Sequence, residues 1–282
     1  VMDTLMARYF GPHPYAYPIL GSTKSLKNPR LTEMRKFFED YYVASNMALV
    51  LSGDFDTQQV MPILEKDFSR IRPGNVPKQE KVMLPPFNGR ERMKVKFPIP
   101  FIKAMAFGFR GVPANHEDQV ALNIAVNLLN NTNGTGYLDK LMVEHKLMGA
   151  VAIHNSLNEA GILAIAIMPK LLVQSYGSAE KMVWNEINRV KNGDFSDDVF
   201  SSLKLEQKRQ YASALENIDS RATVMMNLFS QGKSWDDYLN EVARIESITK
   251  EDVVRVAQKY FSNNYLCVTK STGKYPKDNL PK

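Results

Sequence analysis

The histidines come first in a search for metal chemistry, because imidazole is a common zinc ligand. The chain contains four of them, His13, His116, His145 and His154. No pair has the H-E-x-x-H or H-x-x-E-H spacing that aims two imidazoles of one helix at one zinc ion. The segment ending at His145 carries the Glu-His end of such a motif, but Leu141 stands where the first histidine would be. We therefore interpret Glu144 and His145 as a surface pair, and we expect no catalytic or metal-ligating residue in this chain.

Motifs for covalent or phosphate chemistry are incomplete. The single cysteine, Cys267, lies in the apolar run YLCV, which is typical of a buried thiol that does not act as a nucleophile. The turn at 133–136 lacks the lysine of a phosphate-binding loop. His13 lies between two prolines and is interpreted as a loop residue with a backbone partner. The alternative, that His13 lines a cleft, stays open.

Charge and hydrophobicity argue against two classes of binding protein. The net charge of +6 comes from 36 basic and 30 acidic residues scattered over 282 positions, without the clustered Lys and Arg of a nucleic-acid-binding surface. No apolar run reaches the roughly 18 residues of a membrane span. The longest such run, 161–168, fits a buried strand. A single cysteine does not identify a compartment, so the sequence predicts no localisation.

Hydrophobic periodicity predicts a mixture of helices and strands. Apolar residues at helical spacing indicate helices at about 1–10, 33–42, 57–70, 113–130, 137–147, 175–192, 196–230 and 249–261. Continuous or alternating apolar runs indicate strands at 47–51, 93–97, 102–109, 150–156, 161–168 and 265–269. Five proline and glycine residues within 73–86 interrupt all periodicity and predict a linker.

A weak internal repeat relates the two ends of the chain. Residues 33–50 align without gaps to residues 251–268, at an offset of 218 positions (251 − 33). Both segments have the pattern of an amphipathic helix, an asparagine turn and a buried strand. The second copy begins near Met93, so the equivalent start of the first copy would lie about 125 residues before Val1 (218 − 93). We therefore expect a duplicated domain whose first copy lacks its front portion.

The segment 13–54 resembles the insulinase/pitrilysin family of zinc peptidases, the inverzincins (M16 type). The shared pattern is H-P-Y beginning at His13, P-x-x-G beginning at Pro18, a helix, Y-x-x-x-N-M beginning at Tyr42, an apolar strand and a final G-D. In that family this block closes the first of two related domains, and the remainder of the chain resembles the second domain more weakly.

The resemblance implies a fold and a set of domain boundaries. Each domain would be α+β, with an antiparallel sheet and helices packed on one face. The boundaries would be a truncated first domain at 1–72, a linker at 73–92 and a second domain at 93–275, followed at 276–282 by a tail or the start of a linker between the two halves.

The resemblance also implies where the chemistry lies. Family members hold zinc with the two histidines of H-x-x-E-H and a later glutamate, and the motif glutamate activates the zinc-bound water against a peptide carbonyl. None of those positions exists in this sequence, so they would lie upstream of it. The chain is then expected to be a fragment of a zinc metalloendopeptidase that encloses unfolded peptides between two halves, and to be inactive alone. Its partners would be the unfolded peptide substrate and either the missing upstream segment or the second half of the parent protein. The alternative is a non-catalytic scaffold or partner subunit, which the same family contains.

Overall fold

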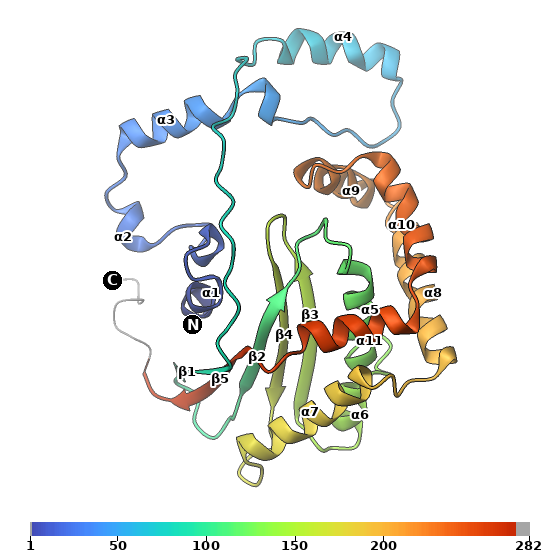
Figure 1. The fold of residues 1–282 in the computed structure, drawn as a ribbon. Coiled ribbons are helices and arrows are strands. Elements are labelled where there is room, and N and C mark those ends of the chain that lie inside the picture. Colours follow the sequence, from blue (N-terminus) through green and yellow to red (C-terminus); the bar gives the residue numbers. More distant parts are fainter. Residues whose placement is uncertain (1, 275–282) are drawn as a thin grey trace. The chain divides into compact units, whose positions relative to one another are not determined.

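A computed structural model describes residues 2–274, those at 23 and 24 by their backbone only. The helices are α1 (Met2–Phe10), α2 (Thr23–Leu26), α3 (Leu31–Tyr41), α4 (Thr57–Phe68), α5 (Gln119–Leu129), α6 (Tyr137–Val143), α7 (Tyr176–Lys191), α8 (Asp197–Ser213), α9 (Ile218–Ser230), α10 (Trp235–Ser247) and α11 (Lys250–Tyr260), with short 3-10 turns at Pro14–Ala16 and Ala44–Asn46. The strands are β1 (Arg90–Phe97), β2 (Met105–Gly111), β3 (Gly149–Ser156), β4 (Gly161–Met168) and β5 (Tyr265–Thr272), as labelled in Figure 1.

The chain folds as two compact units, which are described separately. The sheet unit consists of the residues up to Tyr17, Met83–Arg209 and the residues from Asn240 onward, and it holds the five described strands. The helical unit consists of Pro18–Val82 and Gln210–Leu239 and contains α2, α3, α4 and α9.

The sheet has the strand order β1-β5-β2-β4-β3, with β1 and β3 at its edges. The pairs β2–β4, β2–β5 and β3–β4 are antiparallel, whereas β1 runs parallel to β5. The expected antiparallel sheet is therefore mixed at one edge. The reason is topological: β1 and β2 have the opposite directions of a hairpin, and β5 enters between them. Because β5 is antiparallel to β2, it must run parallel to β1.

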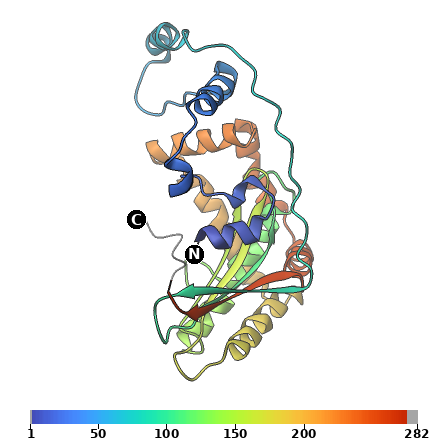
Figure 2. The same cartoon turned by 90° about the vertical axis from the view of Figure 1, so that its left-hand side faces the viewer.

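Helices cover one face of the sheet, as the resemblance implies, and the main core lies under them. Strand side chains alternate between faces, so Phe107, Phe109 and Ile165 point into this layer, where all three are fully buried. Helices α5, α6, α7, α8 and α11 supply the opposing apolar residues. Figure 2 shows α7 and α11 on this side of the sheet and α1 on the other.

The opposite face of the sheet is partly covered by α1. Tyr9 and Phe10 of α1 are buried there with Phe87 and Leu266. The Tyr9 hydroxyl donates to the Gly161 carbonyl at 3.1 Å, which fixes α1 to β4. Farther along this face, Val151 and Ile153 of the edge strand β3 stay exposed. The sheet therefore keeps an open apolar strip on the side away from its main helix layer.

In the helical unit, the turn after α3 is tied to the segment after α4. The Ala44 N–H donates to the Arg72 carbonyl at 2.9 Å. Val43 is buried against Gly74, where a Cβ would lie only 2.7 Å from the Val43 Cγ1 atom. Even so, α3 and α4 leave large apolar side chains exposed, namely Met34, Phe37, Phe38, Met61, Ile63 and Phe68.

The strand predicted at 47–51 is wrong. The backbone at Met47 is extended, with φ −122° and ψ 140°, but no strand forms there. A strand needs a neighbour to pair its N–H and C=O groups, and the structure describes no strand between residues 18 and 82. Met47, Leu49 and Leu51, which a sheet would bury, are exposed.

The single helix predicted over 196–230 is also wrong, because the chain forms α8 and α9 with a break between them. Asn217 starts the second helix: its side chain accepts hydrogen bonds from the N–H groups of Asp219 and Ser220 at 2.8 and 3.2 Å. Helix α10 is not among the predicted helices. Within residues 2–274, no helix is both long and apolar enough to cross a membrane.

Candidate functional site

The incomplete zinc motif lies at the end of α6. Leu141, at the position of the missing histidine, is buried in the main core. His145 is exposed, with a positive φ of 54°. The neighbouring carboxylate pairs elsewhere, since Lys146 Nζ lies 2.6 Å from Glu144 Oε2, and the hydrogen bond from Lys146 lowers the pKa of Glu144. The surface pair that forms is thus Glu144 with Lys146.

The His13 side chain is held by contacts at both ring nitrogens. Its Nδ1 atom accepts from the Tyr15 N–H at 3.1 Å, and its Nε2 atom lies 3.2 Å from a carboxylate oxygen of Glu159. The His13 side chain is fully buried. The ring therefore orders the turn after α1 and lines no open cleft.

His154 and His116 are likewise engaged in structural contacts. The His154 Nδ1 atom lies 2.7 Å from Asn123 Oδ1 of α5, and its Nε2 atom accepts from the Val112 N–H at 3.4 Å. Burial lowers the pKa of His154 to about 4, so the ring is neutral near pH 7. The His116 Nδ1 atom accepts from the Asp118 N–H at 3.0 Å.

Zinc does not fit the side chains of this part of the chain. Residues 2–274, the side chains at 23 and 24 aside, contain no group of three or more His, Cys, Asp and Glu that could hold a metal ion. Cys267, the free thiol, is buried in β5, where burial raises its pKa and leaves it protonated.

The strongest electrostatic cluster surrounds Asp118, at the start of α5. Its carboxylate lies 2.7 Å from Arg255 Nη1 and 2.8 Å from Lys259 Nζ, and it accepts from the Tyr260 hydroxyl at 2.7 Å. Burial would raise the pKa of Asp118, but the hydrogen bonds from Lys259, Tyr260 and Arg255 outweigh it and hold the pKa well below its ordinary value. The cluster ties α5 to α11. These contacts stabilise the fold.

Sequence reasoning missed the Asp118 cluster. The spacing of Arg255 and Lys259 is a usable signal, because residues four apart share one helix face. Their partner is about 140 positions earlier in the sequence, however, and no local pattern connects it to them.

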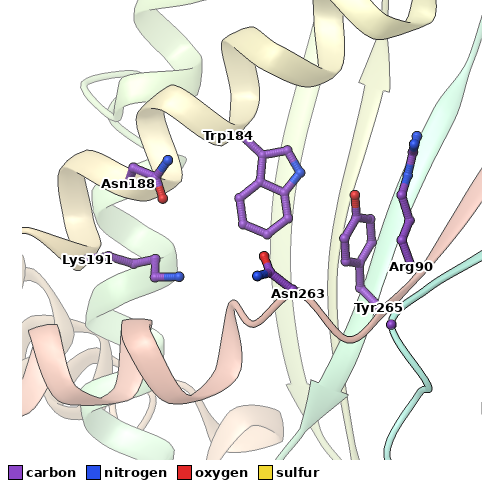
Figure 3. A pocket seen from close by; sticks show the side chains of 7 residues that line it. Arg90, Trp184, Asn188, Lys191, Asn263 and Tyr265 are labelled. Atoms are coloured by element: carbon purple, nitrogen blue, oxygen red, sulfur yellow. The ribbon is translucent and has the colours of Figure 1, made fainter.

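An open cavity of about 550 Å³ lies on the sheet unit, between α7 and the residues that follow α11 (Figure 3). Its wall includes Arg90 and Tyr265 at the beginnings of β1 and β5 and Trp184 and Lys191 on α7. Sequence reasoning missed this site too, because its residues come from three distant segments. It is a candidate binding site on the described part of the chain.

Comparisons with known proteins give a consistent assignment. A protein-family profile described as "Peptidase M16 inactive domain" matches residues 30–206. The chain is 24% identical over 262 residues to the zinc protease PqqE of Helicobacter pylori, covering 89% of this chain and 57% of that protein. It is 22% identical over 258 residues to a probable inactive metalloprotease, YmfF of Bacillus subtilis, covering 87% of this chain and 57% of that protein.

A solved structure has the same fold. The crystal structure of a protease from Helicobacter pylori superposes with a TM-score of 0.80 at 21% sequence identity, covering 95% of this chain and 66% of that chain. The chain thus spans little more than half of the two curated relatives and two thirds of the solved chain.

Proposed function

We propose a function from one premise: the chain belongs to the peptidase M16 family, through the domain that the family describes as inactive. On this premise the chain is the non-catalytic part of a zinc metalloendopeptidase that degrades peptides in a chamber between two halves. The metal motif lies upstream of residue 1, on a segment that completes the first domain. The observation that carries the proposal is the match of 30–206 to that inactive domain.

The exposed apolar side chains of the helical unit support the proposal that an upstream segment packs against this unit. Phe37 and Phe38 of α3 are each 56% exposed, and Ile63 of α4 is 58% exposed. Several large apolar side chains left exposed on one unit are typical of a surface that another part of a protein covers. The extended segment 47–51, which lacks a neighbouring strand, would gain one from the same cover.

The open face of the sheet supports contact with a peptide. Val151 and Ile153 of the edge strand β3 and Met168 of β4 are exposed there. The backbone of this edge is partly occupied, since the N–H groups of Ala150 and Ala152 donate to side chains of neighbouring elements. An extended peptide has the same side-chain repeat as a strand, so its apolar side chains can pack against these exposed residues.

A second function deserves a test, because one relative is a probable inactive metalloprotease. In this alternative the chain belongs to a scaffold or partner subunit that keeps the fold and has lost the metal. The surfaces of these 282 residues are the same in both cases, so the difference lies outside them.

The test is to read and then express the upstream segment, about 125 residues by the repeat offset. The peptidase reading expects H-x-x-E-H and a later glutamate. It also expects about one zinc per joined polypeptide by elemental analysis, and cleavage of a quenched fluorescent peptide that a chelator abolishes. A segment with the fold but without the motif, giving a polypeptide with neither zinc nor cleavage, would establish the scaffold instead.

A further inference from the structure

The cavity beside α7 has an uncompensated positive charge at one end. Lys191, in the last turn of α7, is half-buried, and its Nζ atom donates to the Phe261 carbonyl at 3.1 Å. Among the described residues no carboxylate forms an ion pair with Lys191. An ammonium group has three N–H bonds, so this one keeps donors for an anion in the cavity.

Two amide side chains lie beside this charge. Asn188 of α7 and Asn263, in the turn after α11, both line the cavity. Figure 3 shows Asn188 and Lys191 to the left of the Trp184 ring and Asn263 below it. The described part of the chain provides no hydrogen-bond partner for either amide. One ammonium and two amide donors form a site for a carboxylate, whose two oxygens accept several hydrogen bonds.

The middle of the cavity is aromatic and fixed. The rings of Trp184 and Tyr265 lie 5.4 Å apart between centroids. The Tyr265 hydroxyl donates to Glu180 at 2.8 Å, and the other oxygen of Glu180 lies 2.5 Å from Arg90. Arg90 and the Tyr265 hydroxyl are therefore already partnered, and the unpaired donors remain at the Lys191 end. The cavity suits a ligand with a carboxylate at one end and an apolar group beside it.

The edge strand β1 extends this site with a row of cations. From Arg90, every second residue of β1 is basic and exposed, and Arg92, Lys94 and Lys96 have no described ion-pair partner. These side chains repeat at roughly 6.6 Å, twice the rise of a strand, which is the repeat of an extended peptide. Charged residues also protect edge strands from aggregation. Protection from aggregation accounts for the charges of β1, but it does not account for the cavity that lies next to Arg90.

We propose that the cavity between α7 and the start of β5 binds the carboxylate of an acidic peptide. The carboxylate accepts from Lys191, Asn188 and Asn263, an adjacent apolar side chain lies on Trp184, and further acidic side chains follow β1. The carboxylate is either the C-terminus of the peptide or the side chain of Asp or Glu. The site does not depend on the proposed peptidase function, because its residues all lie in this chain and binding is measured without catalysis.

Tryptophan fluorescence of the 282-residue chain tests the proposal. The chain has two tryptophans, so Trp235→Phe leaves Trp184 as the reporter in the cavity wall. Three probes are titrated: acetyl-Glu-Glu-Glu-Leu with a free C-terminus, the same peptide as its amide, and acetyl-Gln-Gln-Gln-Leu with a free C-terminus. Saturable binding of the first is expected. If the C-terminal carboxylate occupies the site, the amidated peptide is expected to bind about tenfold more weakly than the first peptide. If a side-chain carboxylate occupies the site, the glutamine peptide is expected to bind about tenfold more weakly than the first peptide.

Matched variants separate the cavity from the general charge of the protein. Asn188→Asp adds a negative charge inside the cavity and is expected to weaken binding at least tenfold. Asn185→Asp makes the same change on the same helix at an exposed position that does not line the cavity, and is expected to leave binding within about twofold. Both variants change exposed residues, so the fold is retained. The proposal is overturned if no probe binds saturably at millimolar concentration, if all three bind equally, or if both variants weaken binding equally.

Discussion

The buried histidine of β3 predicts a specific loss of stability in mild acid. His154 has a pKa of about 4 in the folded chain because burial disfavours its charged form, against an ordinary value of 6.5. Above pH 6.5 both the folded and the unfolded chain carry a neutral ring. Between pH 6.5 and 4 the unfolded chain takes up a proton that the folded chain does not, so the free energy of unfolding falls as the pH falls through this window.

The magnitude follows from the difference between the two pKa values. Each pKa unit corresponds to about 1.4 kcal/mol, so the interval from 6.5 to about 4 gives an upper limit of about 3 kcal/mol. The ring is not completely shielded from solvent, so we expect a loss of about 1 to 3 kcal/mol between pH 7 and pH 4. His154→Gln is neutral at every pH and should remove this contribution, giving a flatter pH profile even if the variant is less stable at pH 7.

The assay is urea unfolding at several pH values in the Trp235→Phe background, where Trp184 reports on the sheet unit. The control is His145→Asn, which removes an exposed histidine at a position with positive φ that asparagine tolerates. The reasoning is refuted if the wild-type and His154→Gln profiles run parallel from pH 7 to pH 4, or if the control flattens the profile as much as His154→Gln does.

Four further outcomes can be checked on the same chain. Asp118→Asn should lower the free energy of unfolding, measured with urea, by about 2 kcal/mol. The difference in stability between this variant and the wild type should shrink as the pH falls from 5 towards the depressed pKa of Asp118. Gly161→Ala should lower the free energy of unfolding by about 3 kcal/mol or more, because its Cβ would lie 2.3 Å from the Val112 carbonyl oxygen. Gly177→Ala in α7, where the Cβ would meet open space, should raise the free energy of unfolding slightly in the same thermal unfolding assay. Elemental analysis of the dialysed chain should find no stoichiometric zinc, and one equivalent per chain would contradict the assignment of the metal site to the upstream segment. Ile63→Gln should change the stability of the chain alone by less than about 0.5 kcal/mol, yet should lower the melting temperature of the chain joined to its upstream segment; equal effects in both would argue against a covered surface.

Elements whose signal is local could be predicted from the sequence. The strand at 161–168 and the helices at the beginning of the chain, at 175–192 and at 249–261 follow from the spacing of their own apolar residues, and the structure reproduces them. The prediction from local sequence fails at 47–51, because a strand forms only when a second strand pairs with its backbone, and the described residues provide no such partner there. It also fails at Asn217, where one side chain that caps a new helix interrupts an otherwise continuous periodic pattern.

The candidate sites depend on contacts between distant segments, and the sequence predicts these less well. The absence of a zinc spacing around Leu141 and His145 is visible in the sequence, since a helical metal motif is local. The cavity is not visible, because Lys191, Asn263 and Arg90 become neighbours only when β5 pairs with β1. Each of these residues taken alone resembles an ordinary exposed polar residue.

The insertion of β5 between β1 and β2 has a consequence for biosynthesis. The nascent chain can fold α5, α6, β3 and β4 as they leave the ribosome, but the sheet has a gap between β1 and β2 until residues 265–272 have emerged. Until then β1 lacks its only described partner strand, and Phe107 lacks the neighbouring Cys267. Completion of the sheet unit therefore waits for β5, and a chain stalled before β5 would expose unpaired strand edges to chaperones and to other nascent chains.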